Sequence, residues 1–246
     1  MRQALEAIAK EAGDRILKFY PVDDLQIQNK GDGSPVTAAD LAAHEHIQKE
    51  LEKQFELPVV SEESFDESVY PPKHDSYWLV DPLDGTKDFI KGTDHFTVNI
   101  ALIESGKSIA GVVYIPCTGD CYSAFDGQAW KNGEKISTTR KNQEPVVATS
   151  HFHKGESLLD FIKNNDYSKT AAYGSSLKFC LLAEGSIDIY PRLSPTSHWD
   201  TAAGQAVAEA AGCLVVEHES RQPLRYKNLP IINPNFIAHK PDLKWI

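Results

Sequence analysis

The stretch "WLVDPLDGTKDF", residues 78–89, carries two aspartates at the end of an apolar strand. Asp81 and Asp84 flank Pro82, which fixes φ, and Gly85 follows, which allows an unusual backbone angle. A sharp turn there can direct both carboxylates to one side. Burying two neighbouring carboxylates unpaired is costly, so either a cation lies between them or one stays protonated.

More carboxylates occur where apolar segments end. "VVSEES" places Glu62 and Glu63 after a strand, and "HWDTAAG" places Asp200 at the start of an Ala-rich helix. These groups have no His or Cys at ligand spacing. Such a set of hard oxygen ligands suits Mg²⁺ rather than Zn²⁺.

Simpler explanations exist for each acidic group. Asp200 fits a helix N-cap, and Asp40, three residues after Thr37, fits a capping box. The Asp81 turn could be an ordinary acidic turn, and Glu62 with Glu63 a solvated loop. A calcium hand is excluded, since the twelfth position counted from Asp81 is a glycine, and no P-loop motif occurs.

Composition narrows the function classes. The chain has 246 residues, is 41% hydrophobic and 24% charged, and has no apolar run near the roughly 18 residues needed to span a bilayer. A net charge of −10 argues against nucleic acid polymers as partners. The polar helical N-terminus and four cysteines without a CxxC pair predict a cytoplasmic protein with reduced thiols.

The first half mixes helices with hairpin strands. Helical spacing predicts a helix ending near Pro21 and another after Thr37, with one face formed by Leu41, His44, Gln48, Leu51 and Phe55. We expect strands at 59–60, 77–80, 96–103 and 109–115, and a hairpin turn at Asn132-Gly133.

The second half alternates strands with helices. We expect strands at 146–149, 187–190 and, as the last one, 214–217, and helices at 157–163, 176–183 and 199–211. Two α/β halves, 1–138 and 139–246, follow from this change of pattern. The hairpins predict a mixed or antiparallel sheet in the first half.

The acidic motifs, taken in order, resemble the lithium-sensitive, magnesium-dependent phosphatase superfamily that includes the inositol monophosphatases. The matching elements are Asp40, Glu62-Glu63, "DPLDGT" and "WDTAAG", and the resemblance covers the chain from end to end. It implies an inositol monophosphatase-like five-layer α-β-α-β-α sandwich.

Other stretches resemble the 3′(2′),5′-bisphosphate nucleotidase branch of that superfamily: Lys87 after "DGT", "GSSLKFCLLAEG" at 174–185, "YPR" at 190–192 and "GDGSPVTAAD" at 31–40. The resemblance implies hydrolysis of adenosine 3′,5′-bisphosphate (PAP) to AMP and phosphate, with its 3′-phosphosulfate relative PAPS as a second candidate substrate. The alternatives are an inositol monophosphatase, a promiscuous sugar phosphatase, and a catalytically silent phosphonucleotide sensor.

The resemblance also implies roles for the acids. Glu62, Asp81 and the Leu83 carbonyl would hold one Mg²⁺; Asp81, Asp84 and Asp200 would hold a second; a third, weaker ion would lie near Glu62. Thr86 would orient the attacking water and pass its proton to Asp40. The backbone N–H groups of Gly85 and Thr86 would hold the phosphate.

A second phosphate needs separate contacts. The resemblance assigns it Ser175, Ser176, Lys178 and Arg192, with Lys87 as a further substrate contact and His153 as a weaker candidate. Taken alone, Lys178 fits a solvated helix lysine and His153 a surface histidine. Peripheral attachment to the inner membrane is proposed for bacterial relatives, but the sequence has no basic or amphipathic anchor.

Overall fold

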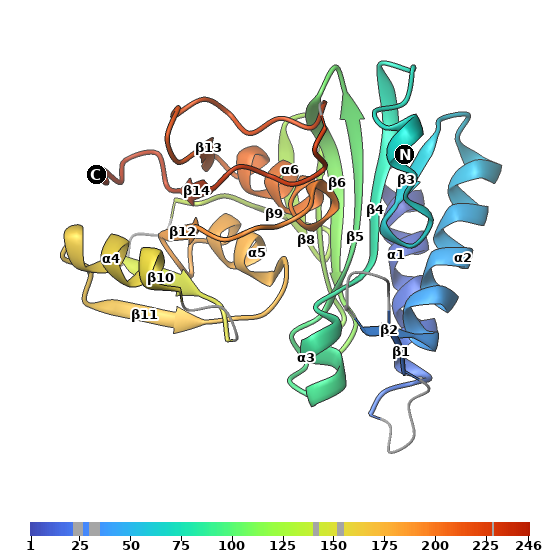
Figure 1. The fold of residues 1–246 in the computed structure, drawn as a ribbon, viewed down its shortest axis with the longest axis horizontal. Coiled ribbons are helices and arrows are strands. Elements are labelled where there is room, and N and C mark those ends of the chain that lie inside the picture. Colours follow the sequence, from blue (N-terminus) through green and yellow to red (C-terminus); the bar gives the residue numbers. More distant parts are fainter. Residues whose placement is uncertain (22–26, 30–34, 140–142, 152–154, 228) are drawn as a thin grey trace.

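The protein is a layered α/β molecule (Figure 1). The computed structural model describes residues 1–21, 27–29, 35–139, 143–151, 155–227 and 229–246, with backbone alone at 27–29 and 35–37. Two short antiparallel strands, β1 (Ile27–Asn29) and β2 (Pro35–Thr37), precede the second helix.

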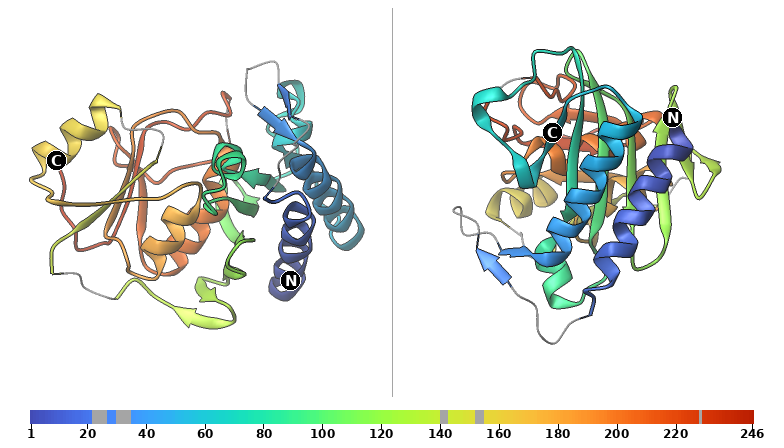
Figure 2. Two further views of the ribbon diagram at one scale, coloured as in Figure 1. Left: turned by 90° about the horizontal axis from the view of Figure 1, so that it is seen from below. Right: turned by 90° about the vertical axis from the view of Figure 1, so that its right-hand side faces the viewer.

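Helices α1 (Arg2–Leu17) and α2 (Ala38–Gln54) form the first layer. They lie side by side across a seven-stranded sheet, as the right-hand view of Figure 2 shows. In spatial order the strands are β3 (Val59–Ser61), β4 (Ser76–Asp84), β5 (Thr97–Glu104), β6 (Lys107–Ile115), β7 (Asp120–Phe125), β8 (Gln128–Lys131) and β9 (Glu134–Ile136). Among the described residues of this sheet, the β3–β4 pair alone is parallel, which confirms the predicted mixed sheet.

The remaining layers follow in the second half of the chain. Helices α5 (Leu177–Ala183) and α6 (Ala202–Ala210) lie between the two sheets, and α4 (Glu156–Asn164) covers the outer face of the second (Figure 1). That second sheet has the order β11 (Lys169–Ala172), β10 (Val146–Thr149), β12 (Ile189–Arg192), β14 (Phe236–His239), β13 (Leu214–Glu217). The predicted five-layer order is therefore confirmed.

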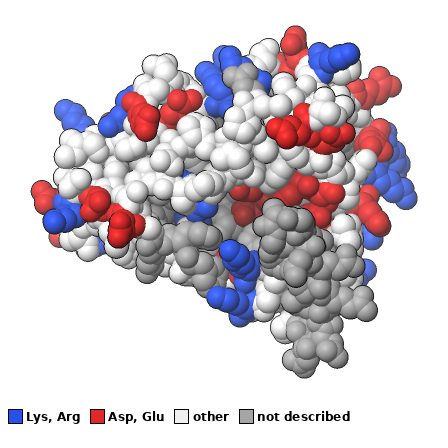
Figure 3. Space-filling model, in the orientation of Figure 1, with Lys and Arg blue, Asp and Glu red and all other residues white. Residues whose placement is uncertain are grey.

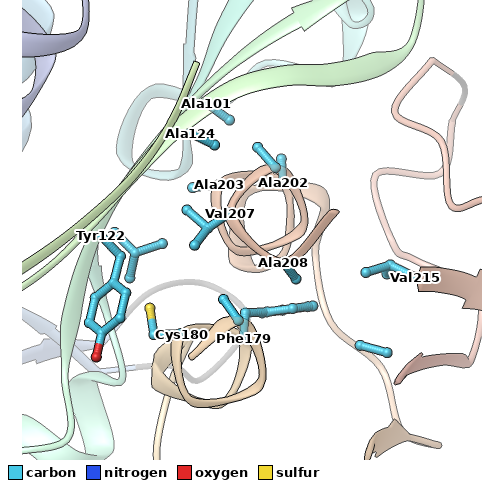
Figure 4. Packing of buried hydrophobic residues seen from close by; sticks show 14 of the residues in the cluster. Ala101, Tyr122, Ala124, Phe179, Cys180, Ala202, Ala203, Val207, Ala208 and Val215 are labelled. Atoms are coloured by element: carbon cyan, nitrogen blue, oxygen red, sulfur yellow. The ribbon is translucent and has the colours of Figure 1, made fainter. Parts of the chain in front are cut away.

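Apolar packing holds the layers together. The largest cluster joins both sheets through α5 and α6, and Figure 4 shows small residues of α6, including Ala203 and Val207, facing Ala101 and Ala124. A second cluster joins α1 and α2 to the other face of the first sheet. A third lies under α4. The small side chains let α6 approach the sheet closely, which brings Asp200, two residues before the helix, toward β4.

Two details of the sequence-based prediction are wrong. The buried apolar face of α2 is formed by Ala39, Ala43, Ile47 and Leu51; Leu51 is buried as predicted, whereas Leu41 is exposed because the two alanines, not Leu41, pack toward the sheet. The strand at 214–217 is also not the last: β14 follows and separates it from β12. The Asn132-Gly133 turn is confirmed, with positive φ at both residues.

Short helices complete the fold: the 3₁₀ helices η1 (Glu62–Ser64), η2 (Glu67–Val69) and η3 (His198–Asp200), and the short α3 (Thr86–Lys91). Among the described residues, none of the helices combines the length and the apolar character that crossing a membrane requires.

Candidate active site

The end of β4 forms the centre of the site. Its pairing with β5 shifts register between Asp81 and Asp84, because Pro82 and Leu83 on β4 lie opposite the single residue Val98 on β5, as in a β-bulge. The Leu83 backbone N–H donates to Asp81 Oδ1 at 3.1 Å, which closes the turn. Gly85 then adopts φ +93°, a left-handed conformation that side chains disfavour. The sequence thus directs both carboxylates away from the strand.

Three carboxylates from separate elements meet there. Glu62 in η1, Asp81 in β4 and Asp200 in η3 each offer a ligand atom, and these atoms all lie within 4.8 Å of one another. Asp200 also accepts a hydrogen bond from the Ser197 N–H at 2.8 Å, in a capping box of η3. The predicted N-cap role in the Ala-rich helix is wrong, because Thr201 is the N-cap of α6 and Asp200 is the third residue of the capping box of η3. This hydrogen bond uses Oδ2 of Asp200 and is compatible with a place in the cluster.

Burial and mutual repulsion set the electrostatics of this cluster. Burial, followed by the charges of Glu62, Asp84, Asp200 and Asp40, raises the pKa of Asp81 well above its usual range. Burial, then Asp84 and Glu62, likewise raises the pKa of Asp200. These carboxylates are costly to ionise together without a cation, and their oxygen ligands suit a hard divalent ion.

Asp84 is positioned from both halves of the chain. Its Oδ2 accepts hydrogen bonds from the Ser176 N–H at 2.7 Å and from Asn99 Nδ2 at 3.3 Å, and the Ser176 hydroxyl donates to the Asp200 carbonyl at 2.7 Å. Thr97 Oγ1 donates to Asn99 Oδ1 at 3.0 Å. Sequence reasoning missed Asn99 and Thr97; their alternation on one face of the otherwise apolar "FTVNIALI" was the available signal.

Asp40 and Thr86 lie at the starts of α2 and α3. Asp40 is buried, and its charge contributes to the raised pKa of Asp81, so it lies near the cluster. Thr86 Oγ1 donates to the Leu83 carbonyl at 3.4 Å. The capping-box alternative for Asp40 involves the Thr37 side chain, which lies outside the described residues, as does His153.

The cluster opens into a cavity of about 280 Å³, which is lined by side chains from residues 62–88 and 150–201. The predicted residues that line it are Glu62, Asp81, Leu83, Asp84, Gly85, Thr86, Lys87, Ser175, Lys178, Arg192 and Asp200. Acidic side chains gather near the centre of the face drawn in Figure 3, and basic side chains lie nearby. The cavity therefore combines a carboxylate group with cationic side chains.

Lys178 and Arg192, two of the residues predicted to bind a second phosphate, are both held by backbone carbonyls. Lys178 is buried, and its Nζ donates to the carbonyls of Ser175 at 2.7 Å and Tyr173 at 3.1 Å. Burial lowers the pKa of Lys178 to about 8. Arg192 also lines the cavity, and its guanidinium donates hydrogen bonds to the backbone carbonyls of Ser194 and Pro195.

The two serines have different surroundings. Ser176 is buried, with its hydroxyl and N–H used by Asp200, Asn99 and Asp84. Ser175 lines the cavity, and within the described structure its buried Oγ has no hydrogen-bond partner. Ser175 is thus available to a ligand, whereas Ser176 supports the carboxylates.

Comparison with known proteins agrees with this geometry. The model of the inositol monophosphatase family matches residues 1–243. The chain belongs to that family. Enzymes of the inositol monophosphatase family generally use Mg²⁺, and the carboxylate cluster of this member fits such an ion by its charge and its oxygen donors.

Several relatives of this family member carry a more specific description. The 3′(2′),5′-bisphosphate nucleotidase CysQ of Shigella flexneri is 45% identical over 235 residues, 93% of this chain and 95% of that protein. CysQ of Haemophilus influenzae is 34% identical, covering 94% and 89%. The crystal structure of Bacteroides thetaiotaomicron CysQ superimposes with a TM-score of 0.86 at 34% identity, covering 98% of this chain and 97% of that one.

Proposed function

We propose that this protein is a magnesium-dependent 3′(2′),5′-bisphosphate nucleotidase that hydrolyses the 3′-phosphate of PAP to give AMP and phosphate. The observation that carries the proposal is the cavity itself, which is lined by the carboxylates of Glu62, Asp81 and Asp200 and also by cationic side chains. Metal ions held by the carboxylates would bind one phosphate group, and the cationic side chains would bind a second. A substrate with two phosphate groups therefore fits the cavity. The identity to CysQ proteins over nearly the whole chain supports the same substrate.

The metal ligands follow from the residues of the cluster. Glu62, Asp81 and the Leu83 carbonyl would hold one Mg²⁺, and Asp81, Asp84 and Asp200 a second, with a weaker third near Glu62. When bound, the ions would polarise the phosphoryl group and stabilise charge on the attacking and leaving oxygens. The hydrogen bonds from Ser176 and Asn99 would keep Asp84 Oδ2 fixed and its other oxygen turned to the cavity.

The proton moves through side chains in this proposal. Thr86 Oγ1 would accept the proton of the attacking water while its own hydrogen passes to the carboxylate of Asp40. Its 3.4 Å contact to the Leu83 carbonyl is long, so the hydroxyl can turn away from it at little cost. The backbone N–H groups of Gly85 and Thr86, which line the cavity, would bind the oxygens of the 3′-phosphate.

The 5′-phosphate would lie toward the second half of the chain. Arg192 would contact it directly, because its guanidinium is already oriented by backbone carbonyls at the cavity wall. The unpartnered hydroxyl of Ser175 and the exposed Lys87 would add contacts. Lys178 would add its charge and hold the 173–175 backbone in place through its two carbonyl contacts.

Phosphate release from PAP, PAPS, inositol-1-phosphate and fructose-1,6-bisphosphate, each with and without Mg²⁺, tests the proposal. We expect PAP to give the highest kcat/KM, with activity lost when Mg²⁺ is removed. Faster turnover of inositol-1-phosphate would favour the inositol monophosphatase alternative, and no release from any substrate would favour the sensor. We also propose a cytoplasmic location, which cell fractionation would test against peripheral association with the membrane.

A further inference from the structure

A second group of ligand-type side chains lies at the mouth of the cavity. Asp88 in α3, His95 before β5 and His151 after β10 each offer a ligand atom, and these atoms all lie within 4.8 Å of one another. Asp88 and His151 line the same cavity as the carboxylate cluster. Neither the metal ligands nor the phosphate contacts proposed above include these three residues.

The orientation of His151 points to a cation between it and Asp88. His151 Nε2 lies 3.0 Å from the Ala172 carbonyl, so in the neutral ring the hydrogen is on Nε2 and donates to that oxygen. Nδ1 then presents a lone pair to Asp88 Oδ1, only 3.4 Å away. Two acceptors at that distance repel each other unless a proton or a metal ion lies between them.

The surroundings of these side chains match the usual support of a metal site. A metal-binding imidazole commonly donates its other N–H to a backbone carbonyl, as His151 does to Ala172. Metal-binding carboxylates are also hydrogen-bonded, and Asp88 Oδ1 accepts from the Thr93 hydroxyl at 2.6 Å. Gly174 makes room for this carboxylate, because a Cβ at that position would lie 2.7 Å from Asp88 Oδ2.

His95 supplies the third ligand. Its ring is stacked on that of His151, with centroids 4.8 Å apart and planes 15° from parallel. Both rings cannot direct a lone pair to one point in this arrangement, so the His95 ring must turn about χ2, a broad torsion. The turn gives up the long 3.3 Å contact from the Gly174 N–H.

We propose that Asp88, His95 and His151 form a binding site for a zinc-like transition metal ion, separate from the magnesium cluster. Two imidazoles and one carboxylate are a zinc ligand set, whereas Mg²⁺ prefers oxygen ligands alone. Three protein ligands leave a fourth position open toward the cavity, where an anionic oxygen can bind. The ion would join α3 and the start of β5 to the segment after β10 and so connect the two halves of the chain.

The site can be tested by binding, independently of the reaction proposed above. Metal-free full-length protein is titrated with ZnCl₂ by calorimetry in excess Mg²⁺, which occupies the carboxylate cluster and spares the imidazoles. The variants are His95→Gln and His151→Gln, and the matched control is His74→Gln, since His74 is exposed and remote from the cavity lining. We expect one Zn²⁺ per chain, bound about tenfold or more weakly by either variant and unchanged in the control.

If a variant misfolds, a spectroscopic measurement on the unaltered protein still tests the site. In ¹⁵N-imidazole NMR, the ring nitrogens of His95 and His151 should shift on addition of Zn²⁺, while those of His74 should not. Absence of Zn²⁺ binding, an affinity unchanged from the parent in both variants, or shifts restricted to other histidines would overturn the site. The last two outcomes would show that Zn²⁺ binds elsewhere.

Discussion

The backbone N–H of Ser176 donates a 2.7 Å hydrogen bond to Oδ2 of Asp84, which lies 92 residues earlier in the chain. The Ser176 hydroxyl donates to the Asp200 carbonyl, and Asn99 Nδ2 donates to both the Ser176 hydroxyl and Asp84. The geometry of two proposed metal ligands therefore depends on one helix start in the second half of the chain and one side chain of β5. This coupling makes Asn99 a testable positioning residue.

Replacing Asn99 by Ala should weaken Mg²⁺ binding. The substitution removes one donor to Asp84 Oδ2 and one to the Ser176 hydroxyl, and loss of such supporting contacts costs about 10–100-fold in metal affinity. The Mg²⁺ dependence of phosphate release from PAP measures it. Asn164→Ala, an exposed position on α4, is the control. An unchanged Mg²⁺ dependence in Asn99→Ala would contradict the positioning role.

Asp81 should be the least replaceable residue. Asp81→Asn preserves the side-chain shape but removes the charge proposed to lie between two cations. We expect turnover to fall well over tenfold, more than about 1.4 kcal/mol of transition-state stabilisation, with the fold intact.

Thermal unfolding provides the second measurement for Asp81. Mg²⁺ should raise the midpoint of the parent protein, because it binds the folded state, and should raise that of Asp81→Asn less. Asp242→Asn, an exposed position near the C-terminus, should behave like the parent. More than about a tenth of the parent activity at saturating Mg²⁺ would rule out the bridging role.

Arg192 should determine the preference for a second phosphate. Arg192→Ala should lower kcat/KM for PAP about tenfold or more, an effect of at least ~1.4 kcal/mol, because a charged contact to the 5′-phosphate is lost. Hydrolysis of 3′-AMP, which lacks that phosphate, should change much less. Arg15→Ala, exposed on α1, serves as the control. Equal losses on PAP and 3′-AMP would show that Arg192 does not contact the 5′-phosphate.

Lys178 should behave differently from Arg192. Lys178→Ala leaves the Tyr173 and Ser175 carbonyls without their buried donor, so we expect the free energy of unfolding to fall by about 1–3 kcal/mol. Because the 173–175 backbone also shapes the cavity, hydrolysis of PAP and of 3′-AMP should both decrease. Urea unfolding and kinetics on the two substrates measure these effects. A loss confined to PAP, with unchanged stability, would instead make Lys178 a simple phosphate contact.

Sequence reasoning is most informative where the site is built from local turns, and Asp81 and Asp84 both line the cavity. The two aspartates of β4 and their glycine lie within five residues, and short-range geometry alone predicts that their carboxylates converge. It failed where separate segments meet. Neither the contact of Ser176 with Asp84 nor the grouping of His95 with His151 has a signal in residue spacing, because both depend on how the two sheets pack around α5 and α6. The α2 face was missed for a related reason: alanines at a close helix–sheet contact do not stand out in a hydrophobic pattern.

Lithium should inhibit the enzyme selectively. Li⁺ is a small, hard cation that prefers oxygen ligands as Mg²⁺ does, so it can occupy the carboxylates of Asp81, Asp84 and Asp200. With one charge it stabilises the leaving oxygen less than Mg²⁺ does. If Li⁺ enters after hydrolysis, when one Mg²⁺ has left, it traps the product complex. We therefore expect inhibition that is largely uncompetitive with PAP, at concentrations where Na⁺ and K⁺ have far less effect.

Initial rates at varied PAP and LiCl and fixed Mg²⁺ measure the lithium effect, against NaCl at equal ionic strength. The ionic-strength control matters because salt also screens the contacts of the exposed Lys87 with phosphate. Matching Li⁺ and Na⁺ curves would show that the proposed second metal position does not discriminate between these ions, contrary to a small cage of carboxylate oxygens. Purely competitive inhibition would be compatible with Li⁺ binding to these carboxylates. It would contradict the proposed order of events, because Li⁺ would then bind before PAP rather than after its hydrolysis.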